Sequence, residues 1–482
     1  MNKFYITTAI DYTNDKPHIG HALEKIQADT IARYHRLKGD DVFFLTGTDE
    51  HGAKIAHSAK ASGKEPQEFV DDIAGKFKAL HESLNLSIKD FIRTTDRERH
   101  WPGAILMWQK LMEAGVLYKK KYRGLYCVGH EAFITEKELV GGKCPDHQKE
   151  PEVIEEENWF FKLSTYRSGI KEKIEKGEFK IMPATRQNEI LAFLEHAEDV
   201  SFSRSKEKLS WGIPVPGDET QTMYVWCDAL TNYVSAIGYG RNEEYKKWWN
   251  AENEIAQVIG KDILRFHAAI WPAMLLAAKL SLPKKLFVHG FITVDGKKMS
   301  KTVGNVIDPE ELVKKYGTDA VRYFFLREIP TGEDGDFSED KFMERYNADL
   351  VNGLGNLVAR VLQMSGQYLD KPISMPNPQG IFESSSGKLM QKHLDVFELD
   401  RALFVLWSRI KDLDILIDEQ KPFDVVKTDK PAAEKQLIYL LTNLAEIAML
   451  LQPFMPDTSK KIVEAITKNK KPENLFVRLV KS

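Results

Sequence analysis

The chain has 482 residues, of which 43% are hydrophobic and 29% charged, and its formal net charge is −3. This size allows about two to four domains, and the near-neutral charge excludes a general polyanion binder, so any nucleic acid must meet a local basic surface. We find no apolar run long enough to cross a bilayer and no signal-peptide layout. Three cysteines are too few for a disulfide framework and favour a reducing, cytoplasmic setting.

The N-terminal stretch predicts a strand, a helix and a second strand. Residues 4–10 are apolar, residues 18–38 carry apolar side chains at helical spacing, and residues 42–45 are apolar again. This order predicts a βαβ unit, in which a ligand sits beyond the carboxyl ends of the strands. Asp49 falls at that edge, where a carboxylate can pair with an ammonium group or simply cap the next helix.

His18, Gly20 and His21 open the first helix at the same edge. A helix N-terminus favours a phosphate, and glycine allows a ligand to approach the backbone. Two imidazoles three residues apart share one helical face and can donate hydrogen bonds to a triphosphate. By itself, the pattern fits equally well two surface histidines that cap a helix.

Between about residues 116 and 218 the pattern changes to short β-like pieces, at 122–127 and 158–163. Two pairs of metal-ligand residues lie at the end of the first piece and between the two, with two residues separating the members of each pair. Such pairs on two adjacent turns can form a tetrahedral zinc site, although coincidence or a knuckle that has lost its metal would give the same spacing. The candidate ligands are Cys127, His130, Cys144 and His147.

Alternating strands and helices resume after this insertion. We expect strands from residue 223, at 255–263 and at 286–290, with a helix over 266–275. The fold class is therefore α/β, a doubly wound parallel sheet that is split by a small β-rich insertion. Aromatic residues gather at the predicted crevice, where they are either core or a pocket suited to an unbranched thioether; they are Tyr12, Trp226, Tyr233, Phe266, His267 and Trp271.

Residues 288–302 form a loop that carries Lys298 and Lys301. Lysine suits a phosphate as a compact charge with rotatable donors, while Asp-Gly followed by Lys-Lys is also ordinary composition for a solvated hairpin turn. From residue 308 the pattern is helical, and it predicts an all-α bundle. The expected helices cover 309–316, 319–327, 338–362, 384–418 and 430–451.

His-Ile-Gly-His at 18–21 and Lys-Met-Ser-Lys-Thr at 298–302 together resemble the HIGH and KMSKS signatures of class I aminoacyl-tRNA synthetases. The amino-acid sequences of residues 9–14, 224–229 and 266–273 narrow the resemblance to the methionyl-tRNA synthetase family. The resemblance implies a Rossmann-like catalytic domain in two halves, 1–115 and 219–290, around a connective insertion, 116–218. Linking helices with the lysine loop (291–345) and an α-helical anticodon-binding domain (346–482) would follow.

The resemblance also implies site residues. Methionine would be bound by Ile10, Tyr12, Asp49, Trp226, Ala229, Tyr233, Phe266 and His267, with Asp49 on the α-amino group. ATP would be bound by His18, Gly20, His21, Gly260, Asp262, Lys298 and Lys301, of which His18, His21, Lys298 and Lys301 would be catalytic. The tRNA anticodon would be read by Asn356, Arg360 and Phe423. Leu230 and Phe423 depart from the residues that many members carry, which are Pro and Trp.

The implied activity is that of a methionine-tRNA ligase acting on methionine, ATP with Mg²⁺ and tRNA(Met), initiator and elongator, with Zn²⁺ in the insertion. We expect a monomer, because the chain stops soon after residue 456, where some members continue into a dimerising module. The alternatives are another class I specificity, a small nucleotidyltransferase, and a catalytically silent tRNA-binding paralogue. The nucleotidyltransferase would need neither the lysine loop nor the helical C-terminal third.

Overall fold

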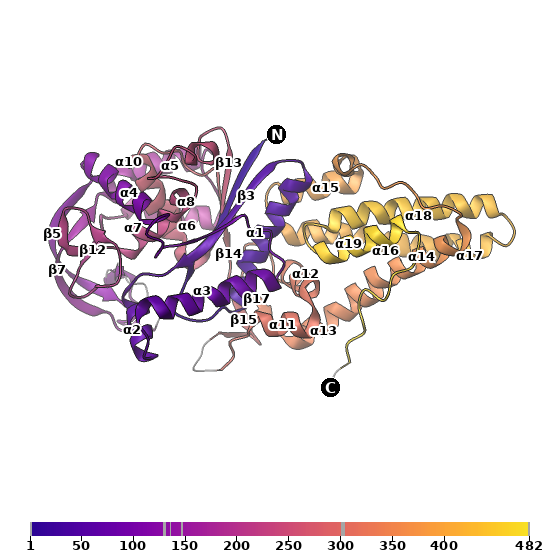
Figure 1. Ribbon diagram of the computed structural model, residues 1–482, viewed down its shortest axis with the longest axis horizontal. Coiled ribbons are helices and arrows are strands. Elements are labelled where there is room, and N and C mark those ends of the chain that lie inside the picture. Colours follow the sequence, from indigo (N-terminus) through magenta and orange to yellow (C-terminus); the bar gives the residue numbers. More distant parts are fainter. Residues whose placement is uncertain (1, 129–131, 135, 146–147, 300–303, 481–482) are drawn as a thin grey trace.

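The centre of this computed structural model is a parallel β-sheet (Figure 1). The structure describes residues 2–128, 132–134, 136–145, 148–299 and 304–480, and seven strands of this described part form the sheet. They are β1 (Lys3–Thr8), β2 (Asp11–Tyr12), β3 (Asp41–Asp49), β4 (Asp90–Arg93), β8 (Lys180–Met182), β13 (Glu254–Gly260) and β14 (Lys285–His289). The strand order is β2-β3-β1-β13-β14-β8, with β4 paired to β3, and every pairing is parallel.

The predicted doubly wound architecture is confirmed. Phe4 and Ile6 of β1 enter one hydrophobic core, while Tyr5 between them enters the other, as the two-residue period of a strand requires. Helix α1 (Ile19–Leu37) belongs to the first core, and α4 (Trp101–Glu113) and α10 (Trp271–Ala277) belong to the second. The other helices of this region are α2 (Ala53–Ala61), α3 (Pro66–Ser83), α7 (Val225–Leu230), α8 (Asn232–Ser235), α9 (Tyr245–Trp248) and the π-helix η4 (Phe266–Ile270).

The insertion is built on a long antiparallel pair, β5 (Leu117–Cys127) and β7 (Glu152–Phe161). Strands β6 (Ala132–Ile134) and β9 (Val200–Ser201) complete this sheet. A second small sheet holds β10 (Ser203–Ser205), β11 (Pro214–Val215) and β12 (Asp218–Met223). The segment also contains two helices, α5 (Arg167–Glu175) and α6 (Ala184–His196), and the strand β8 that joins the main sheet.

One predicted strand is wrong. Residues 223–233 do not enter the main sheet, because β12 ends at Met223 and pairs antiparallel with β10. The chain then turns into α7 and α8. Buried apolar runs of this length suit a strand or a short buried helix equally well, so composition alone did not separate the two.

The lysine loop begins as a β-hairpin of β15 (Ile292–Val294) and β16 (Lys297–Lys298). Asp295 and Gly296 both have positive φ values, 51° and 71°, as a two-residue hairpin turn requires. Strand β17 (Gly335–Phe337) pairs with β15, and helices α11 (Pro309–Tyr316) and α12 (Thr318–Glu328) lead toward the bundle.

The C-terminal part is the predicted helical bundle, which extends away from the sheet in Figure 1. Its helices are α13 (Glu339–Arg345), the π-helix η5 (Tyr346–Gly355), α14 (Asn356–Tyr368), α15 (Ser385–Leu394), α16 (Leu399–Gln420), α17 (Pro422–Val425), α18 (Lys430–Leu451) and α19 (Pro456–Thr467). The helices expected over 338–362 and 384–418 are therefore interrupted, the first by the π-helical segment and the second between residues 394 and 399. None of the described helices is both long and apolar enough to cross a bilayer.

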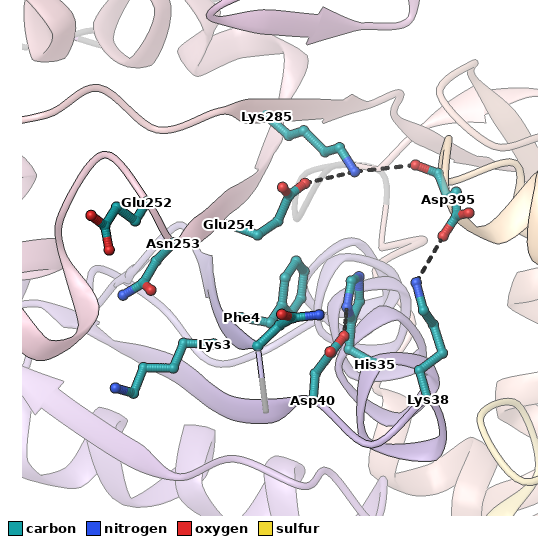
Figure 2. A pocket seen from close by; sticks show the side chains of 11 residues that line it. Lys3, Phe4, His35, Lys38, Asp40, Glu252, Asn253, Glu254, Lys285 and Asp395 are labelled. Atoms are coloured by element: carbon teal, nitrogen blue, oxygen red, sulfur yellow. Dashed lines mark hydrogen bonds and ion pairs between the residues drawn. The ribbon is translucent and has the colours of Figure 1, made fainter. Parts of the chain in front are cut away.

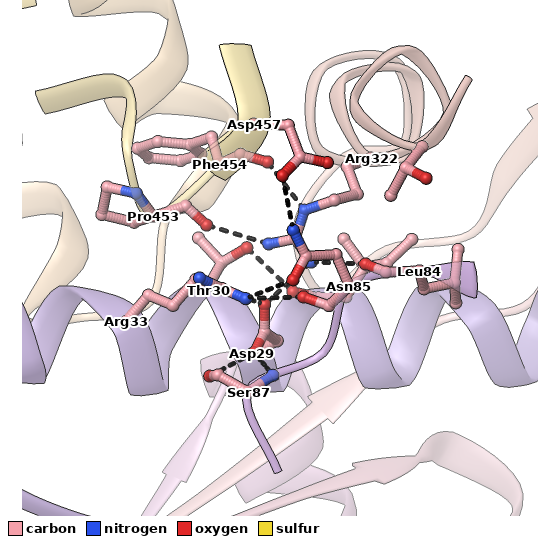
Figure 3. Close-up of polar contacts among 12 residues, drawn as sticks. Asp29, Thr30, Arg33, Leu84, Asn85, Ser87, Arg322, Pro453, Phe454 and Asp457 are labelled. Atoms are coloured by element: carbon pink, nitrogen blue, oxygen red, sulfur yellow. Dashed lines mark hydrogen bonds and ion pairs between the residues drawn. The ribbon is translucent and has the colours of Figure 1, made fainter. Parts of the chain in front are cut away.

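A buried arginine joins the bundle to the sheet region (Figure 3). Arg322 of α12 is fully buried and contacts Asp29 of α1 at 2.8 Å. The same guanidinium donates to the carbonyl oxygens of Pro453 and Phe454, at 3.0 and 2.9 Å, in the turn between α18 and α19. One continuous hydrophobic core runs from α1 through α12 into the bundle. The two parts are thus joined by a polar clamp inside a shared core.

Candidate active site

The histidine motif lies at the start of α1, as predicted. His18 is the N-cap, and its Nδ1 accepts a hydrogen bond from the Gly20 N–H at 3.1 Å. The His18 N–H in turn donates to Nδ1 of His21 at 3.1 Å, and the two rings stack with centroids 3.9 Å apart. A Cβ on Gly20 would lie 2.9 Å from Cε1 of His18, so glycine is needed for this arrangement.

This reciprocal cap fixes the tautomer of both imidazoles. Because each Nδ1 accepts a backbone N–H, each ring carries its proton on Nε2. Burial lowers the pKa of His18, and burial together with the His18 ring lowers the pKa of His21 well below its ordinary value. Near neutral pH both rings are therefore neutral, and each has one N–H donor that the cap does not use.

The lysine hairpin converges on the same helix end. Met299, which follows Lys298, lies 3.9 Å from the position that a Cβ on Gly20 would take. The Ile19 N–H donates to the Ile307 carbonyl at 3.2 Å, which places the end of the loop against the first turn of α1. Lys298 is exposed on β16. Lys301 lies outside the described residues.

The end of β13 supplies the predicted adenosine-binding positions. Gly260 ends the strand, and a Cβ there would lie 2.7 Å from Oδ1 of Asp262 and 3.6 Å from the His289 ring. His289, at the end of β14, contacts Glu24 of α1 at 3.1 Å through its Nε2 atom. The carboxyl ends of the two strands and the start of α1 are thus linked by short contacts.

Most of the aromatic residues predicted to form a pocket lie together on α7, α8 and η4. Trp226 stacks on Phe266, with ring centroids 3.9 Å apart and planes 7° from parallel. The Tyr233 hydroxyl lies 2.7 Å from Nε2 of His267. Nδ1 of His267 donates to the Ile263 carbonyl at 3.0 Å, so Nε2 accepts from Tyr233. Burial lowers the pKa of His267 to about 4, so this ring is neutral near pH 7.

The other methionine-site candidates lie on the strands and helices next to this pocket. β2 and β3 pair with Tyr12 opposite Asp49, and Asp49 is buried at the end of β3. Ala229 is buried in α7, while Ile10 is partly buried and packs on the second core. Trp271 is fully buried and contacts Tyr233, which makes it part of the core.

The zinc candidates are described only in part. Cys127 and Cys144 are both buried, whereas His130 and His147 lie outside the described residues. The Cys144 N–H donates to the Lys149 carbonyl at 2.9 Å, and the Cys144 carbonyl accepts from the Gln148 N–H at 2.8 Å. The described residues contain no group of three or more potential ligands. Two buried thiols therefore fit half of the expected ligand set.

The anticodon candidates lie on the bundle, remote from the crevice. Asn356 begins α14, and Phe423 in α17 is 38% exposed. Arg360 forms ion pairs with Asp414 and Asp418 of α16, at 2.6 and 2.5 Å. Base recognition by Arg360 would require exchanging at least one of these pairs.

Sequence reasoning missed a charged group beneath the histidine motif. Lys25 is fully buried and contacts Asp11 at 3.0 Å and Glu24 at 2.8 Å. Burial raises the pKa of Asp11 to about 7, although Lys25 opposes this shift. Glu24 and Lys25 lie between the apolar Leu23 and Ile26, and charged residues on an otherwise apolar helix face were the available signal.

A different cavity, of about 530 Å³, opens at the amino ends of β1, β13 and β14 (Figure 2). Its charged residues pair with one another: Lys285 contacts Glu254 at 2.8 Å, and Lys38 contacts Asp395 at 3.3 Å. Parallel sheets bind ligands at the opposite, carboxyl edge. This cavity is therefore separate from the predicted crevice.

Comparison with known proteins identifies the family. The family model described as "tRNA synthetases class I (M)" matches residues 4–150 and 146–362. The methionine–tRNA ligase of Thermotoga maritima is 43% identical over 484 residues, covering 98% of this chain and 76% of the relative. That of Brucella melitensis biotype 1 is 43% identical over 478 residues, covering 96% and 92%.

A solved structure agrees. Mycobacterium tuberculosis methionyl-tRNA synthetase in complex with methionyl-adenylate superposes with a TM-score of 0.88 at 37% identity, covering 96% of this chain and 94% of the other. These matches extend over nearly the whole length and agree with the paired histidine and lysine motifs: the chain belongs to the methionyl-tRNA synthetases of class I.

Proposed function

We propose that this chain is a methionine-tRNA ligase, which activates methionine with ATP and transfers the methionyl group to tRNA(Met). The observation that carries the proposal is the convergence of two distant segments, since Met299 of the lysine loop lies against Gly20 of the histidine motif. A triphosphate bound there would have imidazole N–H donors on one side and lysine ammonium groups on the other.

In the first step the methionine carboxylate attacks the α-phosphate of ATP. A carboxylate–phosphorus bond forms, the bond to the β-phosphate oxygen breaks, and pyrophosphate leaves. No side-chain nucleophile is needed, so positioning and charge stabilisation carry the rate. His18 and His21 would donate from Nε2, and Lys298 and Lys301 would close over the pyrophosphate. Mg²⁺ would accompany ATP and neutralise phosphate charge.

The remaining substrate roles follow from the chemistry of the pocket. The stacked rings of Trp226 and Phe266 and the neutral His267 offer an apolar slot for a thioether, because sulfur packs well against aromatic rings. Asp49, buried at the end of β3, would bind the α-ammonium group. Gly260 and Asp262 would hold the adenosine.

On the bundle, Asn356, Arg360 and Phe423 would read the unstacked anticodon bases by hydrogen bonding and stacking. In the insertion, a structural Zn²⁺ would be held by Cys127, His130, Cys144 and His147, and it would tie two turns together in a segment with little core. Metal analysis of the purified chain should find about one zinc per chain, and a Cys144→Ala variant should lose it. We also propose that the chain is a monomer in the cytoplasm, and the small number of cysteines supports the reducing compartment.

Pyrophosphate exchange with each of the twenty amino acids tests the function directly. We expect pyrophosphate exchange with methionine and with none of the other nineteen amino acids. In a separate charging assay, both initiator and elongator tRNA should accept methionine. Exchange with a different amino acid would indicate another class I specificity. Tight tRNA binding without exchange would indicate the silent paralogue.

A further inference from the structure

A buried carboxylate connects two segments of the proposed methionine site. Asp228 lies in α7 between Trp226 and Ala229, which line the proposed thioether slot. Its Oδ2 atom lies 2.6 Å from Nδ1 of His51, two residues beyond Asp49, the proposed ammonium ligand. The carboxylate thus connects the element that forms the slot to the loop that carries the ammonium site.

The second oxygen of Asp228 makes an equally short contact. Oδ1 lies 2.6 Å from Nε2 of His100, the N-cap residue of α4, and Nδ1 of His100 lies 2.8 Å from the Ser235 hydroxyl. The side chains of Asp228, His51 and His100 are 1%, 3% and 0% exposed. Because water does not reach these side chains, their polar atoms must find hydrogen-bond partners within the protein.

The polarity of the two contacts to the Asp228 carboxylate follows from its ionised state. The pKa of Asp228 is lowered to about 2, because the two histidines outweigh the opposing effect of burial. An ionised carboxylate only accepts, so His51 donates from Nδ1 and His100 donates from Nε2. The other nitrogen of His100 lies 2.8 Å from the Ser235 hydroxyl, which is also 3.4 Å from the Asn232 carbonyl oxygen. Charge-assisted hydrogen bonds of this kind are stronger than neutral ones and restrict geometry.

The loop that carries His51 is held from other sides as well. The Trp211 indole donates to the Glu50 carbonyl at 2.6 Å, and Arg93 contacts the Glu50 carboxylate at 2.6 Å. These contacts fix the loop to the insertion and to β4. The bridge through Asp228 is what relates the loop to α7, and therefore to the slot.

We propose that Asp228 is a positioning residue that sets the distance between the ammonium site and the thioether slot, and so selects the side-chain length of the amino acid. This inference rests on the proposed function. Ethionine, which is one methylene longer than methionine, is the appropriate probe, since one methylene in a tight apolar pocket changes kcat/KM by about 10–200-fold.

The test uses Asp228→Asn, which keeps the shape but replaces one acceptor by a donor. We expect the KM for methionine in pyrophosphate exchange to rise about tenfold, with the KM for ATP within twofold of wild type. The preference for methionine over ethionine should fall at least threefold. Rates are divided by the active fraction, measured from the burst of adenylate formation.

Asp29→Asn is the matched control, because Asp29 is also a buried, multiply bonded carboxylate but lies in the clamp with Arg322. It should lower the folded fraction and leave both KM values and the ethionine preference unchanged. If Asp228→Asn behaves like this control, the inference is wrong. If Asp228→Asn does not fold, Ser235→Ala replaces it and should weaken the preference in the same direction; an unchanged preference in folded Ser235→Ala also overturns the inference. Failure of the wild-type chain to exchange pyrophosphate with methionine would instead overturn the proposed function, and the inference with it.

Discussion

Replacing Gly20 by alanine separates the catalytic role of the histidine motif from its structural role. The new Cβ would lie 2.9 Å from Cε1 and 3.0 Å from Nδ1 of His18, about 0.5 Å inside ordinary contact. The His18 ring must turn away, which breaks its bond to the Gly20 N–H and its stack on His21. The Nε2–H of His18 then no longer points toward the proposed phosphate site.

The expected effects on rate and stability differ in size. Loss of one preorganised donor typically lowers kcat by about 10²–10³-fold, so we expect pyrophosphate exchange to slow by roughly 10²-fold. Loss of the cap costs about 1 kcal/mol, and alanine in place of glycine in a helix returns a similar amount. The free energy of unfolding, followed by urea titration, should therefore hardly change.

Gly75→Ala in α3 is the control, because a Cβ there meets nothing within 4 Å. It should keep wild-type exchange and gain up to about 1 kcal/mol in stability. If Gly20→Ala exchanges pyrophosphate within threefold of wild type, the donor role of His18 is refuted.

Three further predictions concern other parts of the molecule. Lys301→Ala should slow adenylate formation and leave methionine affinity, measured by equilibrium dialysis, nearly unchanged; an exchange rate equal to wild type would exclude its role on the pyrophosphate. Arg322→Ala should lower the free energy of unfolding by about 3–5 kcal/mol, because it removes one of the two arginines paired with the buried Asp29 and takes the donor away from two carbonyls between α18 and α19. Arg360→Ala, at a partly exposed pair, should cost less than about 1 kcal/mol. Equal losses in the two variants would contradict this reasoning. Because the folded-state pKa of His267 is about 4, against an ordinary 6.5, the unfolded chain alone gains a proton as pH falls between these values. Wild-type stability should therefore fall across this window by up to about 1.4 kcal/mol per pH unit more than that of His267→Asn, and parallel pH profiles would show that the ring is not held neutral.

The spacing of apolar residues was sufficient to predict an element where that spacing has one clear helical or strand period. The helix over residues 309–316 and the helix over 430–451 have the bounds predicted from the sequence, and the first βαβ unit is present as expected. It was not sufficient where two structures suit the same composition. Val225–Leu230 has the residues of a buried strand but forms a short helix, and the π-helical turn over Tyr346–Gly355 has no signature in apolar spacing.

Some residues of the candidate site could be predicted from the sequence, and others could not. Motif residues such as His18 and Gly260 lie at the carboxyl edge of the sheet, where strand order alone puts them. The partners of Asp228 were not foreseeable, because His51 and His100 lie 177 and 128 residues away in the chain. Contacts between residues so far apart in the chain depend on how three elements pack. A single sequence has no local pattern that indicates that Asp228 contacts these two histidines.

Helix α1 is about 28 Å long, and it belongs to both halves of the molecule. Its first turn carries the capped histidines, its middle is clamped by Arg322 through Asp29, and near its last turn Tyr34 donates to Asp395 of the bundle at 2.5 Å. A single helix therefore extends from the proposed phosphate site at the carboxyl edge of the sheet to Asp395 of the bundle. The C-terminal helices thus contact the same helix whose first turn carries the two imidazoles, and no loop or hinge separates these contacts from the histidine motif.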